Sequence, residues 1–472
     1  MFNDEPFYDL KSVQKVPIYV PKSVPEQHIY NLKSVDPLLF MERKISVTLK
    51  NWKDSPDHMP LLVYGARQVG KTYSVLECGR NHYKNVVYVN FEANTEAAKI
   101  FARDLNPVRI IQELAALFGV TILPSDTLLF FDEIQACEPA LSSLKYFCED
   151  CPDYHIIAAG SLLGVALNRE HHSFPVGKVE MISMYPLDFE EFLWAMGKHA
   201  LADCIRESYE SNIQMALHNT ALDLYLLYLV VGGMPGAVLE YCNREDFDLL
   251  HSVQKNISDA YIADMAKYAQ PAETARIMAV YRSIPAQLAK ANHKFQFRVI
   301  KSGARANLYE SSLSWLNESG VIITCNRVKQ AILPLSVHKE LSFFKIYMTD
   351  TGLLCAHFGL PGHLILQQNS RLDTIKGALT ENYVCFALLV QGYTPYYWES
   401  SGKAEVDFLI QNKNGEIIPI EVKSSENVQS KSLTYFIEQY RPPYAIRISQ
   451  KNFGFDNNIK SVPLYAVHCI DV

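Results

Sequence analysis

The chain has 472 residues, of which 49% are hydrophobic and 20% charged, and its formal net charge is −7. This length and composition predict several domains with buried cores, and exclude a disordered, a collagen-like or a small disulfide-stapled protein. The mildly acidic total also argues against a protein that simply coats nucleic acid, although a total can hide one basic domain.

Residues 1–38 show little periodicity, and we expect them to form an extended N-terminal arm. They lack a basic stretch followed by an apolar core, so no signal peptide is predicted. No apolar run in the chain is long enough to span a bilayer. The ten cysteines show no paired framework, and we interpret the CxxC pattern of Cys148 and Cys151 as reduced thiols, with a metal or redox role as the alternative. We therefore expect a soluble cytoplasmic protein.

Residues 39–53 predict a short helix, and strand and helix patterns then alternate along the chain. The predicted strands cover residues 61–65, 85–92, 126–134 and 154–161, and the predicted helices cover residues 71–80, 108–119 and 140–150. Such alternation, with continuous apolar runs in the strands, predicts a parallel sheet covered by helices on both faces. We assign this α/β domain to residues 39–185.

A phosphate-binding loop is predicted between the first of these strands and the helix that follows it. The pattern GxxxxGK[ST] is matched by Gly65, Ala66, Arg67, Gln68, Val69, Gly70, Lys71 and Thr72. Its glycines let the backbone wrap around phosphates, and the N-terminus of the helix points N–H groups at the anion. Lys71 is predicted to reach the β- and γ-phosphates of ATP, and Thr72 to place its hydroxyl on Mg²⁺.

Acidic residues are predicted to complete this site. Four apolar residues end in Asp132 and Glu133 about 60 residues after the loop, and we expect Asp132 to hold Mg²⁺ and Glu133 to polarise the attacking water. Ser161 ends the next strand, either as a sensor of the γ-phosphate or as a helix N-cap. Arg169 is a weaker candidate for reaching a nucleotide across a subunit boundary.

The segments GARQVGKT, LLFFDEIQ, IIAAGSLLG, FPVGKVE and MYPLDFEEFL resemble the AAA+-type ATPases of prokaryotes that carry a C-terminal domain of unknown function. The resemblance runs from about residue 40 to the end of the chain. It implies a helical lid, which we place at residues 186–270. In related nucleotide switches a Gly-x-Pro of the lid contacts the base, which suggests Pro235 here, with a simple turn between two helices as the alternative.

The middle of the chain is basic. Residues 271–345 hold eleven Lys and Arg against four Asp and Glu, and their helix–turn–helix–strand pattern predicts a winged helix within residues 271–364. Four basic residues are expected near the recognition helix, where they would suit DNA phosphates: Lys294, Arg298, Lys301 and Arg305. The alternatives are a solvated helical face and a winged helix used for protein contact or domain docking.

The last domain, residues 365–472, contains a predicted β-hairpin that bears carboxylates. Asp407 lies on its first strand, and Glu421 and Lys423 share one face of its second strand. Glu381, on a predicted helix upstream, can add a third carboxylate. The order resembles the restriction-endonuclease-like fold, which implies a divalent cation and phosphodiester cleavage, with a non-cleaving scaffold as the alternative.

Together these patterns and the two resemblances predict a P-loop parallel sheet with a helical lid, a winged helix and a C-terminal α/β restriction-endonuclease-like domain. The predicted function is an ATP-binding and ATP-hydrolysing AAA+-type protein, coupled to DNA binding or processing through residues 271–345 and 365–472, with ATP and Mg²⁺ as cofactors. The alternative is a nucleotide-dependent switch that binds a protein or DNA partner without cutting. A homo-oligomer and a protein partner both remain open.

Overall fold

The computed structural model describes residues 18–19, 41–161, 175–290, 294–367, 369–400, 402, 404–425 and 431–471. Arg169 and most of the N-terminal arm therefore lie outside the described residues. The chain forms two compact units. The first contains Lys44–Gly65 and Gly70–Met184 with the strand Ile18–Tyr19, and the second contains Met41–Arg43, Ala66–Val69 and Tyr185–Val472.

Within the described residues, the first unit is built on a six-stranded parallel sheet with the strand order β1-β3-β4-β5-β2-β6. Its strands are β1 (Ile18–Tyr19), β2 (Leu61–Tyr64), β3 (Asn85–Asn90), β4 (Thr127–Asp132), β5 (His155–Gly160) and β6 (Glu180–Ser183). Every residue of β4 and β5 is buried, which is the pattern of strands covered on both faces. The predicted parallel sheet is confirmed, while β1 and β6 were not predicted.

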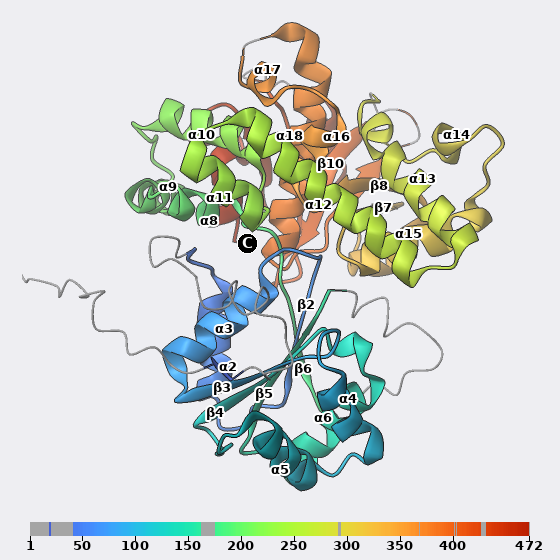
Figure 1. Ribbon diagram of the computed structural model, residues 1–472. Helices are drawn as coiled ribbons and strands as arrows, with labels where there is room; N and C mark the ends of the chain where they lie inside the picture. The colour runs from blue at the N-terminus through green and yellow to red at the C-terminus, as the bar shows by residue number, and fades with distance from the viewer. Residues whose placement is uncertain are drawn as a thin grey trace, which may run out of the picture. The chain divides into compact units, whose positions relative to one another are not determined.

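Helices cover both faces of this sheet (Figure 1). They are α2 (Ile45–Asp54), α3 (Lys71–His82), α4 (Thr95–Arg103), α5 (Pro107–Phe118) and α6 (Glu138–Asp150). Local signals set their ends: the side chain of Asn106 caps α5, and Gly119 ends it in the left-handed conformation. The aromatic core between α4, α5, α6 and the sheet includes Phe101, Phe131 and Phe147. All expected helices of residues 39–150 form, and α4 is an addition.

The second unit begins with helices, as predicted for residues 186–270. They are α8 (Phe189–Ala195), α9 (His199–Ser211), α10 (His218–Val231), α11 (Pro235–Arg244) and α12 (Phe247–Tyr268). The next elements are α13 (Pro271–Leu288), α14 (Phe297–Ile300), η3 (Ala306–Leu308), α15 (Glu310–Glu318), β7 (Ile322–Val328), η4 (Leu335–His338) and β8 (Lys339–Met348). Helix α15, the candidate recognition helix, carries Glu310 and Glu318 and no basic residue. The winged-helix identity of this segment therefore stays a prediction.

The C-terminal region completes the second unit. Its elements are α16 (Thr351–His357), α17 (Gly362–Leu366), η5 (Ser370–Leu372), α18 (Asp373–Val390), β9 (Tyr396–Glu399), β10 (Glu405–Gln411), β11 (Ile417–Val422), α19 (Lys431–Tyr440), β12 (Ala445–Ser449), β13 (Gly454–Asp456), β14 (Ile459–Pro463) and η6 (Leu464–Cys469). Strands β10 and β11 form the predicted antiparallel hairpin, and β12 runs parallel to β11.

One sheet crosses the expected boundary between residues 364 and 365. Within the described residues its eight strands have the order β13-β14-β12-β11-β10-β9-β7-β8. Strand β7 of the predicted winged helix pairs in parallel with β9 of the predicted nuclease-like domain. The two regions therefore share a backbone hydrogen-bond ladder rather than being joined by a linker.

Candidate functional site

The phosphate-loop pattern lies between β2 and α3, where the sequence places it. Gly65 has φ +146°, and a Cβ there would lie 2.0 Å from the carbonyl oxygen of Met184. Gly70 has φ +98°, a backbone angle that residues other than glycine rarely adopt, and it directly precedes the first residue of α3. The two glycines are thus required by a close backbone approach and by the turn into the helix.

Lys71 and Thr72 are held in place at the start of α3. The ammonium group of Lys71 is buried and donates a hydrogen bond of 2.9 Å to the carbonyl oxygen of Gly65, across the loop. The hydroxyl of Thr72 donates to Oδ2 of Asp132 at 2.9 Å. The predicted pairing of the loop with the carboxylate at the end of β4 is therefore present in the geometry.

Asp132 ends β4 and is only 4% exposed. Burial, followed by the neighbouring charge of Glu133, raises the pKa of Asp132 to about 6, although hydrogen bonds from Tyr88 and Thr72 oppose the shift. The phenol of Tyr88 donates to Oδ2 at 2.9 Å. Tyr88 lies 44 residues before Asp132, and only the pairing of β3 with β4 brings them together, so no sequence signal indicated it.

The residues present fit a magnesium ion at this site. Mg²⁺ usually takes one or two protein oxygens and completes its shell with phosphate and water. Thr72 and Asp132 offer two such oxygens within hydrogen-bond distance of each other. A cation there would also relieve the cost of burying an ionised carboxylate beside Glu133.

Glu133 and Ser161 meet next to Asp132. Glu133 has φ +50°, an uncommon conformation for a residue other than glycine, and its Oε2 accepts a 2.6 Å hydrogen bond from Gln135. The hydroxyl of Ser161 lies 3.4 Å from the same oxygen. Strand β5, which ends at Gly160, lies between β2 and β4, so Ser161 follows the strand between the phosphate loop and Asp132. The N-cap alternative concerns residues 162–174, which lie outside the described residues.

The tip of the phosphate loop, Ala66–Val69, belongs to the second unit. The guanidinium of Arg67 pairs with Asp264 of α12 at 2.6 Å, and the hydroxyl of Tyr261 donates to the carbonyl oxygen of Arg67 at 3.1 Å. A Cβ on Gly320 would lie 3.1 Å from the backbone nitrogen of Ala66. These contacts span more than 190 residues of sequence, and sequence reasoning missed all three partners.

Pro235 is the first residue of α11, directly after the Gly232-Gly233-Met234 turn. A carboxylate holds this turn: Oδ2 of Asp350 accepts a 2.6 Å hydrogen bond from the backbone N–H of Gly233. Burial raises the pKa of Asp350 to about 6, while backbone hydrogen bonds around it oppose the shift. These contacts account for the glycines by packing, as in the alternative interpretation, and the nucleotide contact of Pro235 stays a prediction.

The structure brings the C-terminal carboxylates together on one face of the second sheet. Phe408 pairs with Ile420, which places Asp407 beside Glu421 on the neighbouring strand. Oδ2 of Asp407 accepts a hydrogen bond from the backbone N–H of Val422 at 2.8 Å, and Lys423 pairs with Glu421 at 2.6 Å. Burial and the charges of Glu421 and Glu381 hold the pKa of Asp407 well above its usual value.

Glu381 contributes from α18 but has partners already. Its Oε1 accepts hydrogen bonds from the buried ammonium of Lys345 at 2.9 Å and from the phenol of Tyr347. In contrast, Oε2 of Glu421 is buried without a hydrogen-bond partner. Among the described residues, no group of three or more His, Cys, Asp or Glu side chains is arranged to hold a metal ion. The cation site of Asp407, Glu421 and Glu381 therefore stays a prediction.

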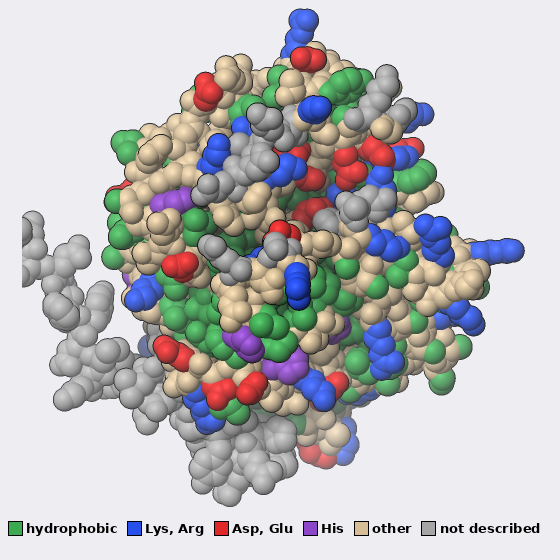
Figure 2. All heavy atoms as spheres, turned by 90° about the horizontal axis from the view of Figure 1, so that it is seen from above, with side chains coloured by type: hydrophobic (Ala, Val, Ile, Leu, Met, Phe, Trp, Pro, Cys, Tyr) green, Lys and Arg blue, Asp and Glu red, His purple; other side chains and the backbone are tan. Residues whose placement is uncertain are grey.

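A chain of alternating charges runs from this cluster along the sheet. Lys345 also pairs with Glu405 at 2.9 Å, Lys294 contacts both Glu405 and Glu399, and Arg327 pairs with Glu399 and Glu340. The expected surplus of positive charge in residues 271–345 is thus offset in part by carboxylates of the C-terminal region. Figure 2 shows, on one face of the molecule, Lys and Arg side chains next to a group of Asp and Glu side chains.

Comparisons with known proteins divide the chain into three matches. Residues 57–193 match the family model of the AAA domain. Residues 222–364 and 376–467 match two domains of unknown function, DUF8612 and DUF4143. A search of curated proteins gives no match. None of the described helices is both long enough and apolar enough to cross a membrane.

Solved structures give distant matches. The Walker-type ATPase of Pyrococcus abyssi is 14% identical, with a TM-score of 0.43, and the match covers 72% of this chain and 98% of that one. The ORC1 protein of Aeropyrum pernix, solved in complex with DNA, is 12% identical, with a TM-score of 0.31, covering 71% of this chain and 97% of that one. The family match and the geometry of the phosphate loop together support an AAA-type nucleotide-binding domain in residues 57–193.

Proposed function

We propose that the protein is an AAA-type ATPase that binds ATP with Mg²⁺ at the phosphate loop and hydrolyses it. The observation that carries the proposal is the hydrogen bond between Thr72 and Asp132, with Glu133 and Ser161 beside it. In this arrangement Lys71 neutralises the β- and γ-phosphates, Thr72 and Asp132 hold the cation, and Glu133 accepts a proton from the attacking water. Ser161 orients Glu133 or the γ-phosphate.

The test separates binding from turnover. Glu133→Gln keeps the shape and the hydrogen-bonding capacity of the side chain but removes its ability to accept a proton. ATP affinity should therefore stay near the parental value while the steady-state rate of ADP formation falls by about two orders of magnitude or more. Glu96→Gln, on the exposed face of α4, is the matched control and should hydrolyse ATP at the parental rate. If the Glu133→Gln variant hydrolysed ATP at the parental rate, Glu133 would be excluded as the general base.

We further propose that the second unit acts on DNA, with Asp407 and Glu421 holding a divalent cation beside Lys423. The support is the placement of these residues on neighbouring strands, the raised pKa of Asp407 and the buried, unpartnered oxygen of Glu421. The region runs α18, then the antiparallel strands β9, β10 and β11, then α19 and the parallel strand β12, and this order is compatible with the nuclease-like prediction.

Calorimetric titration with Mn²⁺ and cleavage assays on duplex, branched and single-stranded DNA test this centre. Asp407→Ala and Glu421→Ala should each lose both Mn²⁺ binding and cleavage, because each variant removes one of the two carboxylates that would hold the cation. Lys423→Ala should keep the cation and lose cleavage, since its charge is placed to stabilise phosphoryl oxygens. Equal Mn²⁺ binding in both carboxylate variants, with no cut on any substrate, would leave a non-cleaving role.

A nucleotide-dependent switch is the second candidate function, and the contacts of the loop tip favour it. Arg67 and the helix α12 are joined by the ion pair to Asp264 and the hydrogen bond from Tyr261. Occupation of the loop should alter these contacts and the protection of α12. We expect ATP to change amide hydrogen exchange in Phe247–Tyr268 of the parent but not of Asp264→Ala. Identical exchange with and without ATP in the parent would contradict the switch.

A further inference from the structure

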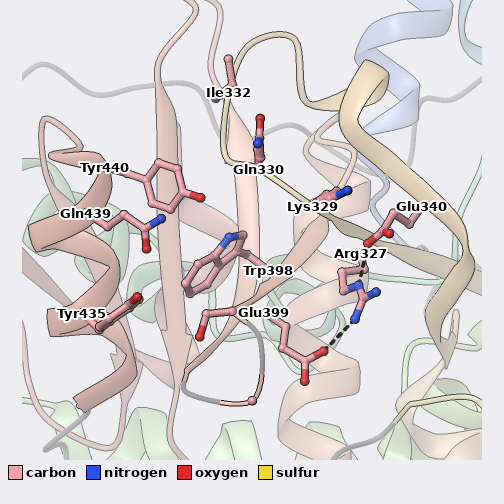
Figure 3. Close-up of a pocket in the computed structure, with 12 residues that line it drawn as sticks. Arg327, Lys329, Gln330, Ile332, Glu340, Trp398, Glu399, Tyr435, Gln439 and Tyr440 are labelled. Carbon is pink, nitrogen blue, oxygen red and sulfur yellow. Dashed lines mark hydrogen bonds and ion pairs between the residues drawn. The ribbon is translucent and has the colours of Figure 1, made fainter.

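A pocket of about 750 Å³ opens in the second unit, and neither predicted site includes it. Figure 3 shows α19 on one side of it, Trp398 at its centre, and the end of β7 with its following residues on the other side. The pocket lies within the size range of small-molecule sites, and it combines aromatic rings with polar side chains. Its two walls indicate what kind of ligand it fits.

The aromatic wall is built as a platform. Trp398 is only 2% exposed, and the ring of Tyr435 stacks on it at an interplanar angle of 25° with 6.2 Å between centroids. Tyr440 supports the indole edge-on, at 86° and 5.7 Å. Tyr435 is 39% exposed, so a buried tryptophan holds an accessible aromatic ring at the pocket. Such a ring suits a flat aromatic ligand such as a nucleobase, because every base can stack on it whatever the sequence.

Amide side chains line the pocket beside this platform. Gln439 follows the tyrosine on α19, and Gln330 faces it from the segment after β7 (Figure 3). Both are exposed, and within the described residues neither side chain has a hydrogen-bond partner. An amide group carries donors and an acceptor together, which is the complement of the edge of an unpaired base.

The two basic side chains at the pocket, Arg327 and Lys329, differ in whether they already have an acidic partner. Arg327 is bound by Glu340 at 2.8 Å and Glu399 at 3.0 Å, so its charge is compensated. Lys329 is exposed and, among the described residues, forms no ion pair. Among the described residues, Lys329 is therefore a cation available to a phosphate next to the base.

We propose that this pocket binds an unpaired nucleobase of single-stranded DNA, with the adjoining phosphate at Lys329. The proposal rests on the proposed role of the second unit in DNA and deepens it by naming the substrate class. The pocket is lined in part by β9, which pairs with β10, the strand that carries Asp407 of the carboxylate centre. In the register of these two strands, Glu399 at the pocket lies opposite Glu405 on β10, and Glu405 precedes Asp407 by two residues.

The test uses the full chain without ATP and a fluorescently labelled oligodeoxythymidylate, followed by anisotropy. Removing the stacking ring in Tyr435→Ala should raise the Kd about tenfold or more, while Tyr435→Phe, which keeps the ring, should bind within about twofold of the parent. Lys329→Gln should raise the Kd and lower its salt dependence. The matched control is Tyr146→Ala, which removes a tyrosine of similar exposure, 38%, from α6 and should leave the Kd unchanged.

Two further arms identify the ligand. A duplex of the same length should bind more weakly than the single strand, and free thymidine monophosphate should compete only at much higher concentration. The proposal is overturned if the parent does not bind the oligonucleotide, if Tyr435→Ala and Tyr146→Ala bind it equally, or if only the free nucleotide binds. ATP turnover and Mn²⁺ titration report on the proposed function separately, so a failure of either leaves these binding results interpretable.

Discussion

At the scale of single residues, the proposed nucleotide site contains a carboxylate, Asp132, for which a proton and a cation would compete. The pKa of Asp132 is raised from 3.8 to about 6 by burial and by Glu133. A raised pKa means that the folded protein favours the protonated form, so this carboxyl group contributes stability below pH 4 that is lost as the pH rises through 6. Cation binding requires the opposite, ionised form.

The first prediction follows from that competition. The affinity for ATP with Mg²⁺ should be full above pH 6 and should fall by up to about tenfold per pH unit below it. Isothermal titration between pH 5 and 8 measures this. Asp132→Asn should lose most of the Mg²⁺ dependence and, with it, the fall in affinity near pH 6. A pH profile that is the same in both proteins would show that Asp132 does not hold the cation.

The sequence predicts some of these residues better than others, for a physical reason. Lys71, Thr72 and Asp132 follow from local patterns, because a loop between strand and helix and a carboxylate at a strand end are both encoded in a few adjacent residues. Tyr88 and Asp264 are missed, because their roles depend on strand order and on a contact across 197 residues. Neither residue type carries a local signal of such a role.

At the scale of elements, the turn Gly232-Gly233-Met234 is fixed by packing on both sides. A Cβ on Gly233 would lie 2.0 Å from the carbonyl oxygen of Leu187, whereas a Cβ on Gly236 would have its nearest neighbour at 3.9 Å. The two glycines are three residues apart but differ completely in the space around them. They form a matched pair for testing how this turn positions α11.

The second prediction uses that pair. Gly233→Ala should lower the free energy of unfolding by about 3 kcal/mol or more, because the backbone contact with Leu187 must open and the hydrogen bond to Asp350 is disturbed. Gly236→Ala, within the first turn of α11, should be neutral or stabilising by up to about 1 kcal/mol. Thermal and urea unfolding compare them. Equal stability of the two variants would contradict the packing seen here.

The hairpin of β10 and β11 is an element that the sequence pattern predicts. Alternating residues and the turn-forming Asn412–Gly415 segment predict both strands and the shared face of Asp407 and Glu421. The pairing of β7 with β9 could not be predicted, because the residues of a strand do not specify which other strand it will pair with. The consequence is large, since it merges the two C-terminal regions into one sheet.

At the scale of the whole molecule, that merged sheet bears on the prediction that the basic segment 271–345 binds DNA. Lys294, Arg327 and Lys345 are engaged with carboxylates, and Lys345 is only 1% exposed. Although burial opposes it, the charges of Glu381 and Glu405 hold the pKa of Lys345 well above its usual value. A count of charges along the sequence cannot reveal such compensation by residues of another segment.

The third prediction separates exposed from compensated charge. Arg298, Lys301 and Arg305 are exposed, and changing all three to Gln should lower the slope of log Kd against log salt by about one for each DNA phosphate that is no longer neutralised. Lys294→Gln should instead leave the slope unchanged and lower stability, because Glu399 and Glu405 lose a shared partner. Parental binding by the triple variant at every salt concentration would exclude this segment as the DNA-binding surface.

Calorimetric titration of ATP with Mg²⁺ into Lys71→Ala tests most directly whether the phosphate loop binds ATP. We expect no measurable binding, because this variant lacks the buried ammonium that would face the β- and γ-phosphates. Lys84→Ala, at an exposed lysine of the same unit, should bind as the parent does. Parental ATP affinity in Lys71→Ala would contradict ATP binding at this loop.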